Sequence, residues 1–264
     1  MSQQSSCVQA SGSGRKRKDC SVGNNSGVTE SKRNKSTGPK SVKTEQSKKV
    51  YTKKIDPEQT EEEEIIFTAN LPTRNKQGKL VFDDWLEFQP VLTPKEVLQA
   101  GSFGGTYFRP IQSGITGKKY DSKVWKELPR DWLDRLNVPK QVCSSSYDEN
   151  VNKYKVKCGG SLQMWEESGW IHKQDPYGWF QWYCRFYQGR RTADDERQIG
   201  RWLRCAGNKG RWRNNLISKC VKSDRNFNDT SVSPVVRQTL QHWAYTLTEA
   251  DFKAHAKILR KKGL

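Results

Sequence analysis

The stretch from Asp175 to Arg191 reads DPYGWFQWYCRFYQGRR and holds the clearest periodic signal in the chain. Its aromatic residues recur at positions i, i+3, i+4, i+7 and i+8, which is the spacing of one face of an α-helix. Gly189 and the two arginines after it are typical of the point where a helix ends. The stretch therefore predicts a helix whose aromatic face comprises Trp179, Trp182, Tyr183, Phe186 and Tyr187.

The aromatic face of this helix has two interpretations. Burial is favoured, because large rings gain most from leaving water, and the helix would then be the central element of the core. The alternative is that the rings are offered to nucleic-acid bases or to another flat ligand.

Later segments repeat the arrangement of an apolar stripe beside a polar or cationic one. Two helices joined by the turn Gly207–Gly210 are expected at Ala193–Ala206 and Arg211–Val221. Two more are expected to start at Ser233-Pro234 and at Thr248, where capping residues precede apolar positions. The inward residues of these helices include Trp202, Trp212 and Trp243.

The segments before the aromatic helix indicate less regular structure. Thr93–Glu96 has the pattern of a capping box with proline at the first helical position, and Gly101 stops that helix. Ile65–Phe67 and Lys79–Phe82 are short and β-prone, and either form a hairpin or drape over the domain.

Three further expectations concern residues 129–170. We expect a helix beginning at Pro129, a loop at Val138–Tyr147, and a helix at Ser161–Trp170 with Trp165 and Trp170 turned inward. The expected fold class is therefore mainly α, a single helical domain at residues 65–264 with minor β structure near its start.

Residues 1–64 have the composition of a disordered basic tail. They are rich in Ser, Gly, Asn and Lys and lack any apolar period, so they cannot bury enough surface to offset the entropy of ordering. Met1–Lys54 holds thirteen Lys and Arg against three Asp and Glu, a net charge of +10, and Asp56–Glu64 is acidic.

Two basic clusters in this tail resemble a two-part nuclear localisation signal. The alternative is a basic arm that binds polyanions without directing import. The clusters consist of Arg15, Lys16, Arg17 and Lys18, and of Lys32, Arg33 and Lys35.

Charge and hydropathy argue against a membrane-spanning or secreted protein. The 264 residues carry a net charge of +18, and residues 65–264 alone hold 34 basic against 20 acidic residues, or +14. No run of about 18 apolar residues predicts a membrane span, and the first 50 residues lack the apolar core of a secretory signal. We therefore expect no membrane association, and with the two basic clusters we expect a nuclear protein.

The seven cysteines include no C-x-x-C pair and are expected to be reduced thiols. A zinc site from Cys143, Cys158, His172 and Cys184 is a weak alternative to ordinary buried cysteines, because the spacings are wide. No metal and no cofactor are predicted.

The basic helix faces favour nucleic-acid binding, with DNA and RNA both open. Clustered Lys and Arg supply phosphate contacts, driven by counterion release. The residues expected to contact nucleic acid are Arg185, Arg190, Arg191, Arg197, Arg201, Arg204, Arg211, Arg213, Asn215, Lys222, Lys253, Lys257 and Arg260.

The pair of helices around Gly207–Gly210 also matches a helix-turn-helix. In that interpretation Arg211, Arg213, Asn214 and Asn215 lie in the first turn of a recognition helix. The pattern is weak, because any two amphipathic helices joined by a short turn fit it.

Two alternatives to nucleic-acid binding stay open. The first is an enzyme acting on nucleic acid, with Asp175, Glu166, Glu167 or His172 as acid or base near the rings of residues 165–177. The second is a structural or protein-interaction module whose positive charge binds acidic proteins.

Four segments carry a resemblance to an uncharacterised eukaryotic family. They are GSFGGTYFRPI at residues 101–111, the aromatic stretch, GRWRNN at 210–215 and SPVVRQTLQHWAY at 233–245. Over about Phe67 to Asp251 the chain resembles basic, tryptophan-rich proteins of fungi, algae and other protists. The resemblance implies no catalytic residue and no cofactor. It implies only that the body is one unit with an accessory tail.

Overall fold

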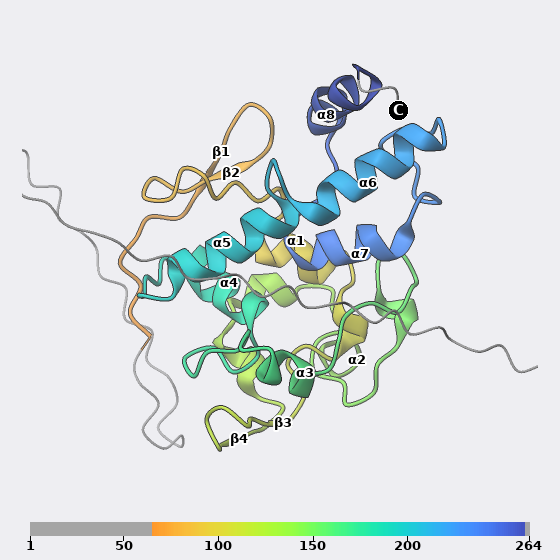
Figure 1. The fold of residues 1–264 in the computed structure, drawn as a ribbon. Coiled ribbons are helices and arrows are strands. Elements are labelled where there is room, and N and C mark those ends of the chain that lie inside the picture. The colour runs from red at the N-terminus through yellow and green to blue at the C-terminus, as the bar shows by residue number, and fades with distance from the viewer. Residues whose placement is uncertain (1–64, 262–264) are drawn as a thin grey trace, which may run out of the picture. The chain divides into compact units, whose positions relative to one another are not determined.

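The computed structural model describes residues 65–261 and shows a mostly helical fold with two small antiparallel sheets (Figure 1). The expected helical fold class is thereby confirmed. The predicted basic tail with its localisation signal lies outside the described residues, as do residues 262–264.

The described residues form eight α-helices. They are α1 (Pro94–Gln99), α2 (Val138–Gln141), α3 (Leu162–Glu167), α4 (Trp179–Tyr187), α5 (Asp195–Ala206), α6 (Arg211–Lys222), α7 (Pro234–His242) and α8 (Glu249–Lys261). Short 3₁₀ turns lie between them, η1 (Phe103–Gly105), η2 (Val124–Glu127), η3 (Arg130–Leu133) and η4 (Glu149–Val151).

The aromatic stretch forms α4, and the helix is buried as the core interpretation predicts. Gly178 precedes it with φ 87° and Gly189 follows it with φ 108°. Both values lie in the left-handed region, which favours glycine. At Gly189 a Cβ atom would also lie 2.4 Å from the carbonyl oxygen of Ala69, so the chain turns here where no side chain fits.

Phe88 is the residue around which the rings of the core gather. Its ring is fully buried and lies 5.7 Å from that of Trp182, 5.5 Å from Phe186 and 5.1 Å from Trp202. The last contact is edge-to-face, an arrangement that aromatic quadrupoles favour. A loop residue thus joins α4 to α5.

The first described segment drapes along the end of α4 and does not form the alternative hairpin. The amides of Thr68 and Ala69 both donate to the carbonyl of Gly189 at 3.0 Å. The strand β2 (Leu80–Val81) pairs instead with β1 (Thr73–Arg74) across a turn at residues 75–79. A second small sheet joins β3 (Ile111–Gln112) to β4 (Lys119–Tyr120).

Helix α1 begins as predicted. The hydroxyl of Thr93 accepts from the amide of Glu96, and the Glu96 carboxylate accepts from the amide of Thr93, which completes the capping box. Gly101, at φ 92°, follows the helix.

Two expectations between residues 124 and 147 were wrong. The helix expected from Pro129 is instead the separate 3₁₀ turns η2 and η3, with Pro129 between them in an extended conformation. The expected loop at residues 138–147 contains α2, whose start is capped by the side chain of Asn137. Elements this short have too few residues to show a recognisable spacing of apolar residues in the sequence.

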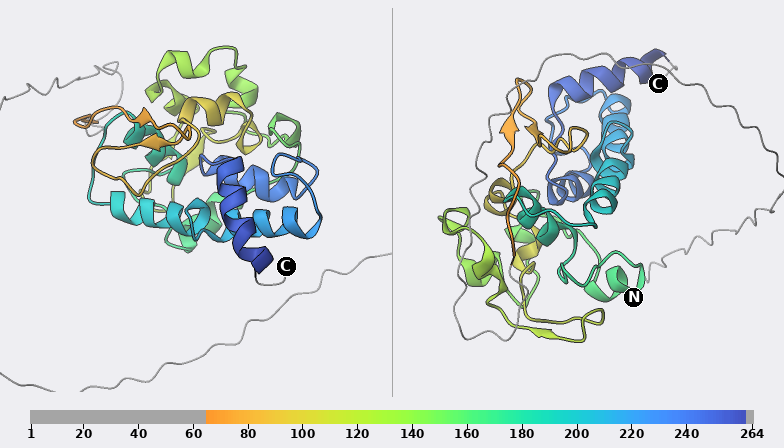
Figure 2. Two further views of the ribbon diagram at one scale, coloured as in Figure 1. Left: turned by 90° about the horizontal axis from the view of Figure 1, so that it is seen from above. Right: turned by 90° about the vertical axis from the view of Figure 1, so that its left-hand side faces the viewer.

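The helices α5 and α6 do not form a helix-turn-helix. In Figures 1 and 2 they follow one another along nearly the same direction instead of crossing. Gly207 ends α5 in an extended conformation, and its amide still bonds to Leu203. A recognition helix packed across its partner is therefore absent from this part of the described chain.

Within residues 65–261, every helix falls short of the length and apolar character that a membrane crossing requires.

Truncating Phe88 tests the core. We expect Phe88→Ala to lower the free energy of unfolding by about 3–5 kcal/mol, because it leaves a cavity among five aromatic rings. Leu86→Ala is the matched control, since Leu86 lies two residues away and is 63% exposed; it should change stability by less than about 0.5 kcal/mol. Urea unfolding followed by tryptophan fluorescence measures both, and equal effects would contradict the assigned core.

Candidate nucleic-acid interface

Arg185 and Arg190 point into the protein, toward Asp175. The Asp175 carboxylate is completely buried and accepts two bonds from Arg190, at 2.8 and 2.6 Å, and one from Arg185 at 3.0 Å. Arg185 also pairs with Glu127 at 2.6 Å. These arginines were expected to face outward, but the turn at Gly189 brings Arg190 back over the Asp175 turn. They are therefore excluded from the candidate interface.

Arg213 is likewise buried, and it ties α6 to α8. Its guanidinium lies 3.0 Å from the carboxylate of Asp251, which also receives Lys79 at 2.8 Å and the Tyr245 hydroxyl at 2.9 Å. Burial opposes ionisation of Asp251, but the bond from Lys79 and the charge of Arg213 hold its pKa below the usual value. Arg213 therefore stabilises the fold by joining α6 to α8.

Arg191 is the third arginine beside the end of α4, and it is mostly covered. Its guanidinium carbon lies 3.8 Å from the centroid of the Phe186 ring, and its Nε donates to Asp84 at 2.6 Å. That hydrogen bond lowers the pKa of Asp84. Arg191 therefore already has a carboxylate partner.

A different set of cations lies on the surface without a carboxylate partner. Arg204 on α5 and Arg211 and Lys222 on α6 are exposed, and no Asp or Glu of residues 65–261 lies within ion-pair distance of them. Asn215 is exposed on the same helix. We call the surface formed by Arg201, Arg204, Arg211, Asn215 and Lys222 the α5–α6 ridge.

One arginine from each helix acts electrostatically on the buried thiol of Cys205. Burial raises the pKa of Cys205 to about 12, and the positive charges of Arg201 and Arg211 oppose that rise.

Arg197 and Arg201 are partly covered. Arg197 pairs with Asp194, with Nη2 donating to Oδ2 at 2.9 Å. Arg201 lies with its guanidinium carbon 5.4 Å from the rings of both Trp170 and Trp243, and no carboxylate of the described residues pairs with it. Of the three α5 arginines, Arg204 is thus the most open to a ligand.

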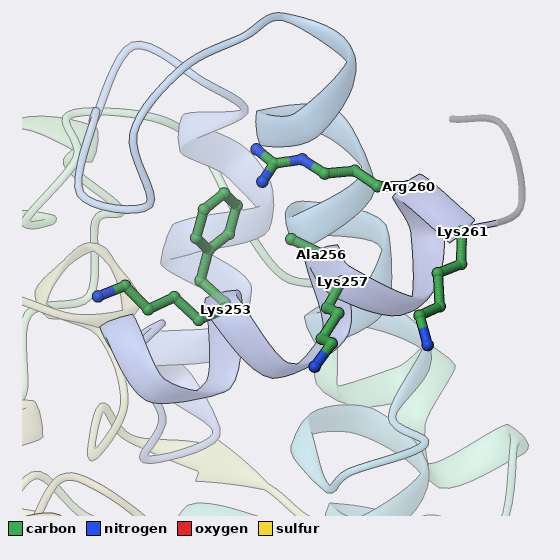
Figure 3. Close-up of a pocket in the computed structure, with 6 residues that line it drawn as sticks. Lys253, Ala256, Lys257, Arg260 and Lys261 are labelled. Atoms are coloured by element: carbon green, nitrogen blue, oxygen red, sulfur yellow. The ribbon is translucent and has the colours of Figure 1, made fainter.

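A second cationic surface covers α8. Lys257, Arg260 and Lys261 are exposed there, and Lys253 pairs with Glu249 at 2.6 Å. Figure 3 shows Lys257 and Lys261 extending to one side of the helix and Arg260 to the other, around a shallow pocket. We call these residues the α8 cluster. Because its cations diverge, it offers less concentrated charge than residues converging on one point.

The zinc alternative was wrong for the described residues. No three His, Cys, Asp or Glu side chains of residues 65–261 converge as metal ligands would. Cys184 lies in the core, where burial raises the pKa of its thiol well above the usual value. A protonated thiol is a poor ligand for zinc.

The residues of the enzyme alternative have structural partners. The carboxylate of Glu166 accepts from the amide of Gly114 at 2.9 Å and from the Ser113 hydroxyl at 3.2 Å. Glu167 accepts from Gln163, and His172 Nδ1 accepts from the amide of Gln174. With Asp175 held between two arginines, these four side chains do not converge on a reactive group.

Trp170 is the feature that sequence reasoning placed on the wrong side. It was expected inward on a helix, but α3 ends at Glu167 and Trp170 is 43% exposed in the loop that follows. The signal that could have indicated this was Gly169, which breaks the helix just before it.

Neutralising the buried carboxylate tests the assignment of Asp175. We expect Asp175→Asn to lower the free energy of unfolding by about 3–5 kcal/mol, because the buried guanidinium of Arg190 loses its counter-charge and that of Arg185 keeps only Glu127. Asp83→Asn, at an exposed position without an ion pair among residues 65–261, is the control and should change stability by less than about 0.5 kcal/mol. Calorimetric or urea unfolding provides the measurement. Full stability of Asp175→Asn would mean that the carboxylate is free for another role.

In comparisons with known proteins, no protein-family model, curated protein or solved structure matches the chain. The case for the interface therefore rests on the residues described above.

Proposed function

We propose that this protein binds nucleic acid, and that the α5–α6 ridge is the main contact with the phosphates. The observation that carries the proposal is the division of the arginines. Buried guanidiniums such as Arg185, Arg190 and Arg213 are matched to carboxylates, whereas Arg204 and Arg211 are exposed and unmatched within the described residues.

The charge of the ridge suits a polyanion better than an isolated anion. Arg204, Arg211 and Lys222 lie on two helices of twelve residues each, which follow one another along nearly the same direction. At 1.5 Å per residue each helix spans roughly 18 Å. Contacts spread over such a length fit a chain of phosphates, and each contact releases a counterion.

The α8 cluster and Arg197 are secondary contacts in this proposal. Lys257, Arg260 and Lys261 are exposed and lack carboxylate partners within residues 65–261. Lys253 and Arg197 already hold acids, so a phosphate would have to displace Glu249 or Asp194. Such an exchange contributes less binding free energy than a contact with a cation that has no partner.

Salt dependence measures the number of phosphate contacts. For the full chain bound to a labelled 24-mer, we expect Arg204→Ala, Arg211→Ala and Lys222→Ala together to reduce the slope of log K against log[salt] by about 2–3. Each lost contact contributes about 0.9. Fluorescence anisotropy at several salt concentrations provides the measurement.

A charge-matched variant controls for net charge. Replacing Lys76, Lys118 and Lys153, which are exposed and outside the ridge, removes the same charge and should leave the slope nearly unchanged. Equal slopes for the two triple variants would refute the ridge as the interface. Equally tight binding of polyglutamate would instead favour acidic proteins as partners.

We also propose a nuclear location, on the basis of the two basic clusters at residues 15–18 and 32–35. Replacing the seven basic residues of these clusters with alanine should shift a fluorescent fusion of the full chain from nucleus to cytosol. The same replacement at seven exposed lysines outside the ridge and the α8 cluster is the control: Lys76, Lys118, Lys119, Lys123, Lys126, Lys140 and Lys153. A fusion that stays nuclear after loss of both clusters would contradict the assignment.

A further inference from the structure

We propose that Trp170, held by Arg201, is a stacking platform for one unpaired base, so that the protein prefers single-stranded nucleic acid. This inference rests on the proposed function and adds to it the class of nucleic acid. It is carried by the exposure of Trp170, its anchoring to α5 and the unmatched charge of Arg201.

The exposure of Trp170 is unusual within this chain. All ten tryptophans lie within residues 65–261, and Trp170 is the single exposed one, at 43%. Its neighbour Ile171 is 7% exposed. Successive side chains therefore diverge here, with Ile171 inside and Trp170 outside.

The backbone that carries Trp170 is anchored to its surroundings. The amide of Trp170 donates to the carbonyl of Trp165 at 2.9 Å, and its carbonyl accepts from Nη1 of Arg201 at 3.1 Å. Gly169, at φ 67°, makes the turn that leads out of α3. An anchored ring loses little conformational freedom when a ligand stacks on it, which favours binding.

Arg201 supplies a cation that has no ion pair with a carboxylate of residues 65–261. Its guanidinium carbon lies 5.4 Å from the rings of Trp170 and Trp243, and it donates to the neutral oxygens of Trp170 and Gln198. Burial and the nearby charge of Arg197 lower the pKa of Arg201 to about 10. An incoming phosphate would relieve this unfavourable environment.

Trp243 connects the platform to the core. Its ring lies 4.6 Å from that of Trp179, the first residue of α4. The nucleotide site would thus contain the positive charges of Arg201 and Arg204. Its aromatic platform would be connected to α4 through Arg201 and Trp243. This combination of stacking ring and cation is the one by which proteins hold single strands.

The class of ligand follows from which surfaces of a base are accessible. In a duplex, both faces of a base are covered by its neighbours, and only an unpaired base presents a face to a tryptophan ring. Stacking does not depend on sequence, since every base has a π-face. DNA and RNA single strands share this chemistry.

The test uses the full chain with three labelled probes: a 12-mer of oligo-dT, a 12-mer of oligo-U and a 12-base-pair DNA duplex. We expect Trp170→Ala to weaken binding of one or both single strands by about 5- to 100-fold and binding of the duplex by less than about twofold. Trp170→Phe should retain most of the single-strand affinity, because phenylalanine also stacks. The two single-stranded probes show whether DNA, RNA or both are held.

Ile115→Ala is the matched control, because Ile115 is 44% exposed and lies outside the ridge. It should leave all three affinities unchanged, and thermal melts should show that every variant is folded. If all three probes bind in a salt-sensitive way, and Trp170→Ala leaves the three affinities unchanged or weakens them equally, Trp170 is not a stacking platform. The proposed function would then remain intact. Absence of salt-sensitive binding to any probe would overturn both.

Discussion

The structure depends on the burial of α4 on nearly all sides. An amphipathic helix needs to bury one face, but here seven of the nine residues are buried, including Phe180, Gln181 and Cys184 beside the aromatic stripe. Burial on nearly all sides leaves polar groups without water, so each needs a partner from another segment. Gln181 accepts from the amide of Tyr177, and Arg185 pairs with Glu127 and Asp175. The aromatic core and the buried ion pairs are thus two consequences of one constraint.

This constraint also determines where the remaining charge lies. Removing an ion from water costs several kcal/mol unless a partner of opposite charge compensates it. Residues 65–264 have fourteen more basic than acidic residues, and the buried carboxylates of Asp175 and Asp251 are already shared among Arg185, Arg190, Arg213 and Lys79. Arg204, Arg211 and Lys222, which have no carboxylate partner within residues 65–261, remain hydrated on α5 and α6, whereas the buried Arg237 donates to the carbonyls of Val232 and Phe227.

Periodicity and capping predicted much of this fold, but not the direction of individual arginines. A 3.6-residue period locates the face of α4, and Thr93 with Glu96 locates the start of α1, because both signals are local. The partners of Arg185 and Arg190 are not local: Glu127 lies 58 residues before Arg185, and Asp175 meets Arg190 only after the turn at Gly189. Arg185 and Arg204 both sit on polar stripes of their helices, yet only tertiary packing decides that one is buried and the other exposed. The expected interface therefore contained two classes of arginine that sequence cannot separate.

The same reasoning explains why Trp170 differs from the other rings. Trp182 and Trp202 stay in the core because neighbouring segments cover them, and the indole nitrogen of each finds an acceptor, Asp195 for Trp182 and the Trp243 carbonyl for Trp202. Trp170 follows the end of α3, so no further helical turn covers it, and the adjacent guanidinium of Arg201 keeps one edge of the site polar. An apolar partner would leave that cation without compensation, whereas a nucleotide brings a flat face for the ring and a negative charge for the arginine. The pairing of the two side chains thus favours a ligand that is aromatic and anionic at once.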